Sequence, residues 1–163
     1  MSVARPVMPW GKPVPEMGVR HRNMARYYGS GRGWETPPEV FDPLDAEFHF
    51  TLDPCATPET AKCARYFTEA DDGLAQSWVD EIVFMNPPYG REVRVWTAKA
   101  VAEVAQGTTV VGLLPASTDL EWWHRDVVAT GAEVRYIRGR VRFLQGERWV
   151  SGMFPSVIVV WRP

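Results

Sequence analysis

The sequence predicts a single α/β domain whose sheet is mostly parallel and covered by helices. Strand-like and helix-like segments alternate over most of residues 47–143, which is typical of strands joined by crossover helices. Residues 110–114 are a nearly continuous apolar run, the mark of a strand covered on both faces. The last two strand candidates, 134–143 and 157–161, have no helix between them, so we expect them to pair antiparallel.

Residues 1–33 predict a flexible basic N-terminal arm ahead of an ordered domain in residues 34–163. The arm holds six basic residues and one acid, whereas the whole chain has 18 basic and 20 acidic side chains. It is rich in proline and glycine and lacks helical or strand periodicity. Its arginines, Arg26 and Arg32 among them, suit contacts with nucleic-acid phosphates; the alternative is a solvated tail.

Composition excludes several classes of protein. A length of 163 residues suits one domain. The two cysteines, Cys55 and Cys63, fit free thiols of an intracellular protein better than a disulfide framework. No segment resembles a signal peptide, and no apolar run approaches the roughly 18 residues of a membrane helix. We therefore expect a cytoplasmic protein with no membrane partner.

The first ordered part combines a short helix with short strands. Thr36, two prolines and Glu39 form a capping-box pattern that begins a helix, and Pro43 is expected to end it early. Residues 47–53 alternate apolar and polar, so we expect a strand ending at Asp53. Three smaller elements follow: one or two helical turns over 60–64, a short strand over 65–67 and a turn at 71–74.

The second half predicts two amphipathic helices. The first has apolar residues at helical spacing and a terminating glycine: Val93, Trp96, Ala100, Val104 and Gly107. The second opens on a capping box at Thr118 and Glu121 and has three inward residues: Leu120, Trp123 and Val127. Trp122 and Trp123 suit core packing better than insertion into a base stack.

The strand candidate over residues 134–143 is broken by Gly139 and followed by an expected loop over 144–155. Three arginines share one face by the two-residue period of a strand: Arg138, Arg140 and Arg142. The opposite face is apolar: Ile137, Val141 and Phe143. The arginine face favours a nucleic-acid partner.

The most informative stretch is an apolar strand, 82–85, that ends in Asn86, Pro87, Pro88, Tyr89 and Gly90. Two prolines cannot continue a strand, so the chain leaves the sheet in a rigid turn at its carboxyl edge, where open α/β sheets bind ligands. An amide, an aromatic ring and fixed carbonyls are poorly suited to acid–base chemistry or metal binding, and no metal is expected. They suit a flat molecule that carries an amino group.

Asn-Pro-Pro-Tyr after an apolar strand resembles the signature of the S-adenosylmethionine-dependent amino-methyltransferases. Further segments occur in the order seen in the compact phage-type DNA adenine methyltransferases: Trp34-Glu35-Thr36-Pro37, Leu52-Asp53-Pro54-Cys55-Ala56, Asp72-Gly73-Leu74, Trp78 and Gly139-Arg140-Val141-Arg142-Phe143. This resemblance covers residues 34–161 and implies a Rossmann-like sheet with an antiparallel C-terminal strand pair. Only residues 57–85 separate the first-strand loop from the Asn-Pro-Pro-Tyr turn, so the N-terminal half must be compressed.

The resemblance implies that residues 34–163 are a methyltransferase domain acting on double-stranded DNA, in a bacterial host or phage-infected cell. It would move a methyl group from S-adenosylmethionine to the 6-amino group of a flipped adenine. Hydrogen-bond acceptors on Asn86 and Pro87 would stabilise the charge that develops on the amino nitrogen, Pro88 would stiffen the turn, and Tyr89 would stack on the base.

The cofactor residues follow from the same resemblance. Thr36 and Pro37 would lie along the methionine end, Asp72 would accept from the adenine, and four residues would form the first-strand loop: Asp53, Pro54, Cys55 and Ala56. Each has a plainer alternative: Thr36 and Asp53 also suit helix caps. Phe143 would pack against the target base, although its apolar neighbours favour a core position.

One departure from the wider pattern lies in the first-strand loop, which lacks the usual glycines. Alternatives therefore stay open: another acceptor (the cytosine 4-amino group, RNA adenine or a protein glutamine), or an inactive nucleic-acid-binding relative. No separate recognition domain is apparent. Base reading is expected from the loops at 144–155 or 117–124, from the arm, or from a second subunit of a homo-oligomer.

Overall fold

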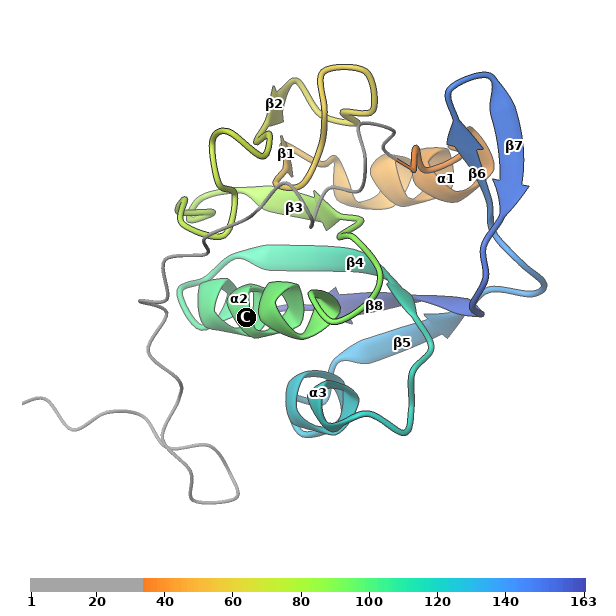
Figure 1. Ribbon diagram of the computed structural model, residues 1–163. Coiled ribbons are helices and arrows are strands. Elements are labelled where there is room, and N and C mark those ends of the chain that lie inside the picture. Colours follow the sequence, from red (N-terminus) through yellow and green to blue (C-terminus); the bar gives the residue numbers. More distant parts are fainter. Residues whose placement is uncertain (1–33) are drawn as a thin grey trace, which may run out of the picture.

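The structure is a computed structural model that describes residues 34–163 (Figure 1). Its main sheet has six strands in the order β2-β1-β3-β4-β8-β5. These strands are β1 (Leu52–Asp53), β2 (Arg65–Tyr66), β3 (Ile82–Met85), β4 (Thr109–Pro115), β5 (Glu133–Tyr136) and β8 (Ser156–Trp161). The arm expected over residues 1–33 lies outside the described residues.

Strand directions confirm the expected fold class. Strands β2, β1, β3 and β4 pair parallel, while β8 lies antiparallel between β4 and β5. The two strands of the N-terminal half, β1 and β2, have two residues each. The sheet is therefore mostly parallel, with the antiparallel pair at the C-terminal end and a compressed N-terminal half.

Helices cover both faces of the sheet. They are α1 (Pro38–Phe48), α2 (Val93–Val104), and α3 (Glu121–Trp123), which continues into the π-helical turn η2 (His124–Val128). Alternate residues of β3 point to opposite sides: Val83 and Met85 pack with α2 and α3, and Phe84 packs with α1. The central strands are thus buried on both faces, as their continuous apolar runs predict.

Helix α1 differs from the expectation in both its start and its length. Its N-cap is Pro37, without a side-chain cap, so the expected capping box does not form. The helix continues past Pro43 because Phe41 and Leu44 bury its inner face while the proline ring lies exposed. His49 ends it in the left-handed conformation (φ 57°), which leaves only the end of the expected 47–53 strand as β1.

The region 144–155 is not the expected loop, because it contains most of a β-hairpin. Strand β6 (Arg142–Gln145) pairs antiparallel with β7 (Arg148–Ser151) outside the main sheet. Gly146 opens the two-residue turn with φ 62°, a value that glycine adopts without strain. The expected 134–143 strand is indeed broken at Gly139, and its two halves belong to different sheets.

The second amphipathic helix is also irregular. Leu120 is its N-cap, without a side-chain cap, and is 45 % exposed, so both the capping box and the inward position expected there are wrong. Trp122, Trp123 and Val127 are buried, which confirms core packing for the tryptophans. The Ala129 backbone donates to the His124 carbonyl (2.9 Å), a π-type turn that widens the helix around these side chains.

The remaining helix agrees with its sequence pattern. Helix α2 buries Val93, Trp96 and Ala100, and Gly107 follows it with φ 100°. Within residues 34–163, none of the helices is both long and apolar enough to cross a membrane.

Candidate active site

The Asn-Pro-Pro-Tyr turn follows β3 directly, at the carboxyl end of the parallel strands. Pro87 is buried, and Asn86, Pro88 and Tyr89 are half-buried. The carboxyl ends of β1 and β4 flank this turn, because both strands run parallel to β3. Asn86 therefore lies at the sheet edge where open α/β folds bind their ligands.

The side-chain amide of Asn86 is held in one orientation. Its Nδ2 donates to the carbonyl oxygen of Trp34 and to Oγ1 of Thr36, both at 3.1 Å. A carbonyl oxygen can only accept, so the nitrogen must face this segment and Oδ1 must face away. None of residues 34–163 donates to Asn86 Oδ1 or to the Pro87 carbonyl, so both remain available as acceptors.

Three aromatic rings support the turn. Phe143 meets Tyr89 edge-on, with centroids 6.1 Å apart, and Trp34 meets Phe143 in the same way at 5.5 Å. Phe143 is 2 % exposed, which is the core position that its apolar neighbours favour. The Tyr89 hydroxyl lies 3.4 Å from Oγ of Ser156. Burial raises the pKa of Tyr89, so its side chain stays neutral.

The first-strand loop is organised by Asp53, which is buried. Its Oδ1 accepts the Cys55 N–H (3.3 Å) and its Oδ2 accepts the Lys62 N–H (3.2 Å). Desolvation raises the pKa of Asp53 to about 6, against the opposing effect of these two donors. Asp53 thus orders the loop from within, and it caps no helix, because turns and then β2 follow it.

Cys55 and Ala56 connect this loop to its neighbours. Burial raises the pKa of the Cys55 thiol well above its ordinary value, and the nearby Asn86 backbone N–H acts in the opposite direction. The Ala56 N–H donates to the Phe67 carbonyl (3.0 Å). The loop and the Asn-Pro-Pro-Tyr turn are therefore in direct contact.

The turn at Asp72 and Gly73 packs onto the same loop. A Cβ placed on Gly73 would lie 2.0 Å from the Pro54 carbonyl oxygen, so only glycine fits at this position. Asp72 adopts the left-handed conformation (φ 52°), and its Oδ1 is buried without a partner among the described residues. A buried acceptor with no donor is costly, and a bound ligand with an N–H would satisfy it.

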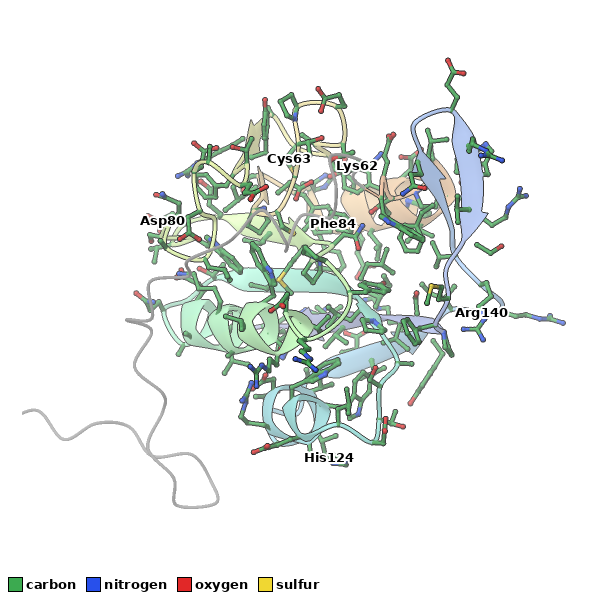
Figure 2. The ribbon with its side chains drawn as sticks, viewed as in Figure 1. Lys62, Cys63, Asp80, Phe84, His124 and Arg140 are labelled. Carbon is green, nitrogen blue, oxygen red and sulfur yellow. The ribbon has the colours of Figure 1, made fainter. Side chains whose placement is uncertain are left out.

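Glu35 joins three parts of the site. Its side chain pairs with Nζ of Lys62 (2.8 Å), and its backbone exchanges hydrogen bonds of 2.9 and 3.1 Å with Leu144 of β6. Figure 2 shows Lys62 on the loop between β1 and β2, on the side of α1, where it lies over the Phe41 ring at 5.9 Å. Sequence reasoning assigned no role to either residue of this pair.

The arginines proposed for nucleic-acid binding lie where the chain passes from β5 to the hairpin. Arg138, Arg140 and Arg142 are all exposed, and Figure 2 shows Arg140 at the outer margin of the molecule. Arg26 and Arg32 lie outside the described residues. Of the expected site residues, the structure brings Thr36, Cys55 and Asn86 together and leaves the arginines at the periphery.

The groups at the centre of this geometry suit recognition of an amino group. Within residues 34–163, no group of three or more His, Cys, Asp or Glu side chains is placed to hold a metal ion. The central groups are hydrogen-bond acceptors and an aromatic ring.

Comparison with known proteins identifies the family. A family model described as DNA N-6-adenine-methyltransferase (Dam) matches residues 29–163. The chain belongs to this family. A relative from Escherichia coli (strain K12), named "Putative methyltransferase YfdM", is 36 % identical over 66 residues, covering 36 % of the chain and 72 % of the relative. The protein is accordingly a methyltransferase of the Dam family, with the fold and signature that the sequence predicted.

Proposed function

We propose that this Dam-family protein transfers a methyl group from S-adenosylmethionine to the 6-amino group of an adenine flipped out of double-stranded DNA. The observation that carries the proposal is the orientation of Asn86. Its Nδ2 is occupied by Trp34 and Thr36, so Oδ1 faces away from them, and none of residues 34–163 donates to it or to the Pro87 carbonyl. Two acceptors at one end of a rigid turn suit the two N–H groups of an amino substituent.

An exocyclic amino nitrogen is a weak nucleophile because its lone pair is delocalised into the ring. Acceptors on Asn86 and Pro87 would draw its N–H groups out of conjugation and stabilise positive charge at the nitrogen. The prolines keep these acceptors fixed, so little reorganisation accompanies the reaction. No residue needs to remove a proton before methyl transfer, which agrees with the absence of Cys, His or Lys from this turn.

S-Adenosylmethionine supplies the electrophilic methyl group when bound. The buried Oδ1 of Asp72 has no partner within residues 34–163 and fits a donor on the adenine of the cofactor, and Gly73 keeps that turn against Pro54. The loop at Asp53–Ala56 would hold the cofactor beside Asn86, because Cys55 already contacts the Asn86 backbone. Thr36 and Pro37 would lie at its methionine end, with the Thr36 hydroxyl directed at Asn86 and not at the cofactor.

Tyr89 would hold the flipped base by stacking, a contact worth ~1–3 kcal/mol. Its hydroxyl is anchored at Ser156 and its edge at Phe143, so the ring is oriented before the base arrives. Unstacking and unpairing the adenine makes its amino group accessible to Asn86.

The test is methyl transfer from labelled S-adenosylmethionine to genomic DNA from a methylation-free host. We expect label in DNA, recovered as the N6-methylated deoxyadenosine after digestion, and a loss of at least ~100-fold for Asn86→Ala, since a fixed hydrogen-bonding group aimed at developing charge contributes about this much. Gln106→Ala, which removes an exposed amide, is the matched control.

Three results would contradict the proposal. Label recovered in cytosine, RNA or protein would show that the methyl acceptor is not adenine in DNA. Equal rates for the wild type and Asn86→Ala would remove Asn86 from the chemistry. Cofactor binding in calorimetry without any transfer would indicate an inactive relative.

A further inference from the structure

The turn between β7 and β8, residues 152–155, places apolar side chains in solvent. Met153 is 76 % exposed and Phe154 is 48 % exposed. Residues on both sides of the pair are anchored: the Gly152 N–H donates to the Val141 carbonyl and the Pro155 carbonyl accepts from Ala116, both at 2.8 Å. A fixed backbone thus presents two large apolar groups.

This turn lies one aromatic ring away from the Asn-Pro-Pro-Tyr turn. A Cβ on Gly152 would lie 3.2 Å from the Phe143 ring, so the 152–155 turn packs directly on that ring. Phe143 in turn meets Tyr89 edge-on at 6.1 Å. Figure 1 shows the hairpin beyond the carboxyl ends of β3 and β4.

Arginines outnumber acids around this turn and its hairpin, where Glu147 is the exposed acid at the hairpin tip. Four exposed arginines surround the hairpin and make no ion pair within residues 34–163: Arg138, Arg140, Arg142 and Arg148. By contrast, Arg135 and Arg162 pair with Glu133 and Glu47. Arg140 also donates to the Met153 carbonyl (3.4 Å), which ties a cation to the apolar pair. A phosphate-bearing partner complements this surface.

We propose that Met153 and Phe154 form an apolar wedge that enters the base stack of duplex DNA beside the target adenine. Apolar side chains inserted between base steps stabilise opened, kinked DNA, while arginines bind the flanking phosphates. The wedge would occupy the space that a flipped base leaves and so keep the base at Tyr89. This inference rests on the proposed function and assigns the wedge to this turn rather than to Trp122 or Trp123, which are buried.

The test compares Met153→Ser/Phe154→Ser with the wild type on genomic DNA from a methylation-free host, native and heat-denatured. We expect transfer to native DNA to fall at least tenfold, transfer to denatured DNA to change by less than threefold, and S-adenosylmethionine binding to stay unchanged. Met153→Leu/Phe154→Leu should keep most of the wild-type rate. Tyr136→Ser is the matched control, because Tyr136 is 83 % exposed on β5 and should leave all rates unchanged.

Equal activity of the serine variant and the wild type on native DNA would overturn the wedge. An equal loss of activity on native and denatured DNA would also overturn it, because such a loss indicates a DNA contact that does not depend on opening the base stack. A change of oligomeric state in the serine variant would assign the pair to a second copy of the chain and also overturn it. A wild type that transfers no methyl group to either DNA would instead refute the proposed function and, with it, the wedge.

Discussion

The side-chain amide of Asn86 donates a hydrogen bond to the hydroxyl of Thr36, 50 residues earlier in the chain. Trp34, the first described residue, accepts from the same nitrogen through its carbonyl. The segment ahead of α1 therefore fixes the orientation of the Asn86 amide, with Oδ1 on the side away from Trp34 and Thr36. The signature turn depends on this segment for its orientation.

Thr36→Val should separate this orienting role from direct cofactor contact. Valine keeps the shape of this buried side chain but removes the acceptor, a loss worth about 1–2 kcal/mol that corresponds to roughly tenfold in kcat. We expect kcat for methyl transfer to fall about tenfold with the KM for S-adenosylmethionine unchanged, and Thr36→Ser to restore kcat. A raised cofactor KM at normal kcat would instead place the hydroxyl on the cofactor.

Gly73→Ala should weaken cofactor binding more than it alters DNA binding. The added methyl group would lie 2.0 Å from the Pro54 carbonyl oxygen, so the turn at Asp72 must move away from the first-strand loop. We expect S-adenosylmethionine affinity, measured by calorimetry, to fall at least about tenfold, because a single displaced acceptor costs ~1–3 kcal/mol. Ala75→Ser, at an exposed position nearby, is the control. Unchanged affinity in Gly73→Ala would separate this turn from the cofactor site.

Much of the fold could be predicted because its core elements have strong patterns. Strands β4 and β8 are apolar runs, and helix α2 has regular spacing and a terminating glycine. The sequence does not predict the hairpin because β6 and β7 have only four residues each, with polar residues at both ends, and their Gly146-Glu147 turn lacks the Asn-Gly or Asp-Gly pair that is the strongest short-range hairpin signal. The sequence predicts too short a helix α1 because Pro43 disfavours a helix interior. The burial of Phe41 and Leu44, which stabilises the longer helix, depends on tertiary contacts that the local pattern does not show.

The sequence predicts the Asn-Pro-Pro-Tyr turn of the candidate site, but it does not predict most of the contacts that hold this turn in place. Asn86 to Tyr89 could be identified from one segment, because two prolines directly after an apolar run force the chain out of the sheet. The Trp34 carbonyl, the Glu35–Lys62 pair and the approach of Gly73 to Pro54 join segments far apart in sequence. Among these contacts, only the approach to Pro54 has a local sequence signal, which is the glycine after Asp72.

Asp53 should make stability depend on pH between about 4 and 6. Its pKa is raised from 3.8 to about 6 by burial, so in this range the folded protein keeps a proton that the unfolded chain has lost. The unfolding free energy should therefore fall as pH rises through this window, by up to about 3 kcal/mol. Urea unfolding of the wild type and of Asp53→Asn at pH 4, 5, 6 and 7 measures this contribution. Asp53→Asn should lack it, and identical pH profiles would contradict the prediction.

The buried pair of Lys99 and Glu103 should contribute to stability through coupling rather than through either charge alone. The two side chains are ion-paired, with 5 % and 4 % of their surface exposed, and Glu103 Oε2 also accepts the Trp78 backbone N–H at 2.9 Å. Glu103→Gln keeps an acceptor for Trp78 but leaves the Lys99 ammonium unpaired, at a cost of about 3–5 kcal/mol.

Lys99→Met alone should be similarly costly, because it leaves Glu103 as the unpaired buried charge. The double variant removes both charges and should lose clearly less than the sum of the single variants. Urea unfolding of all four proteins gives the coupling free energy, and strict additivity would show that the two charges do not compensate each other. The Trp78 indole N–H donates to the Gly73 carbonyl (2.9 Å), and the amide oxygen of Glu103→Gln still accepts the Trp78 backbone N–H, so we expect cofactor affinity to stay unchanged in this variant. Unchanged affinity in that variant would confine the pair to a structural role.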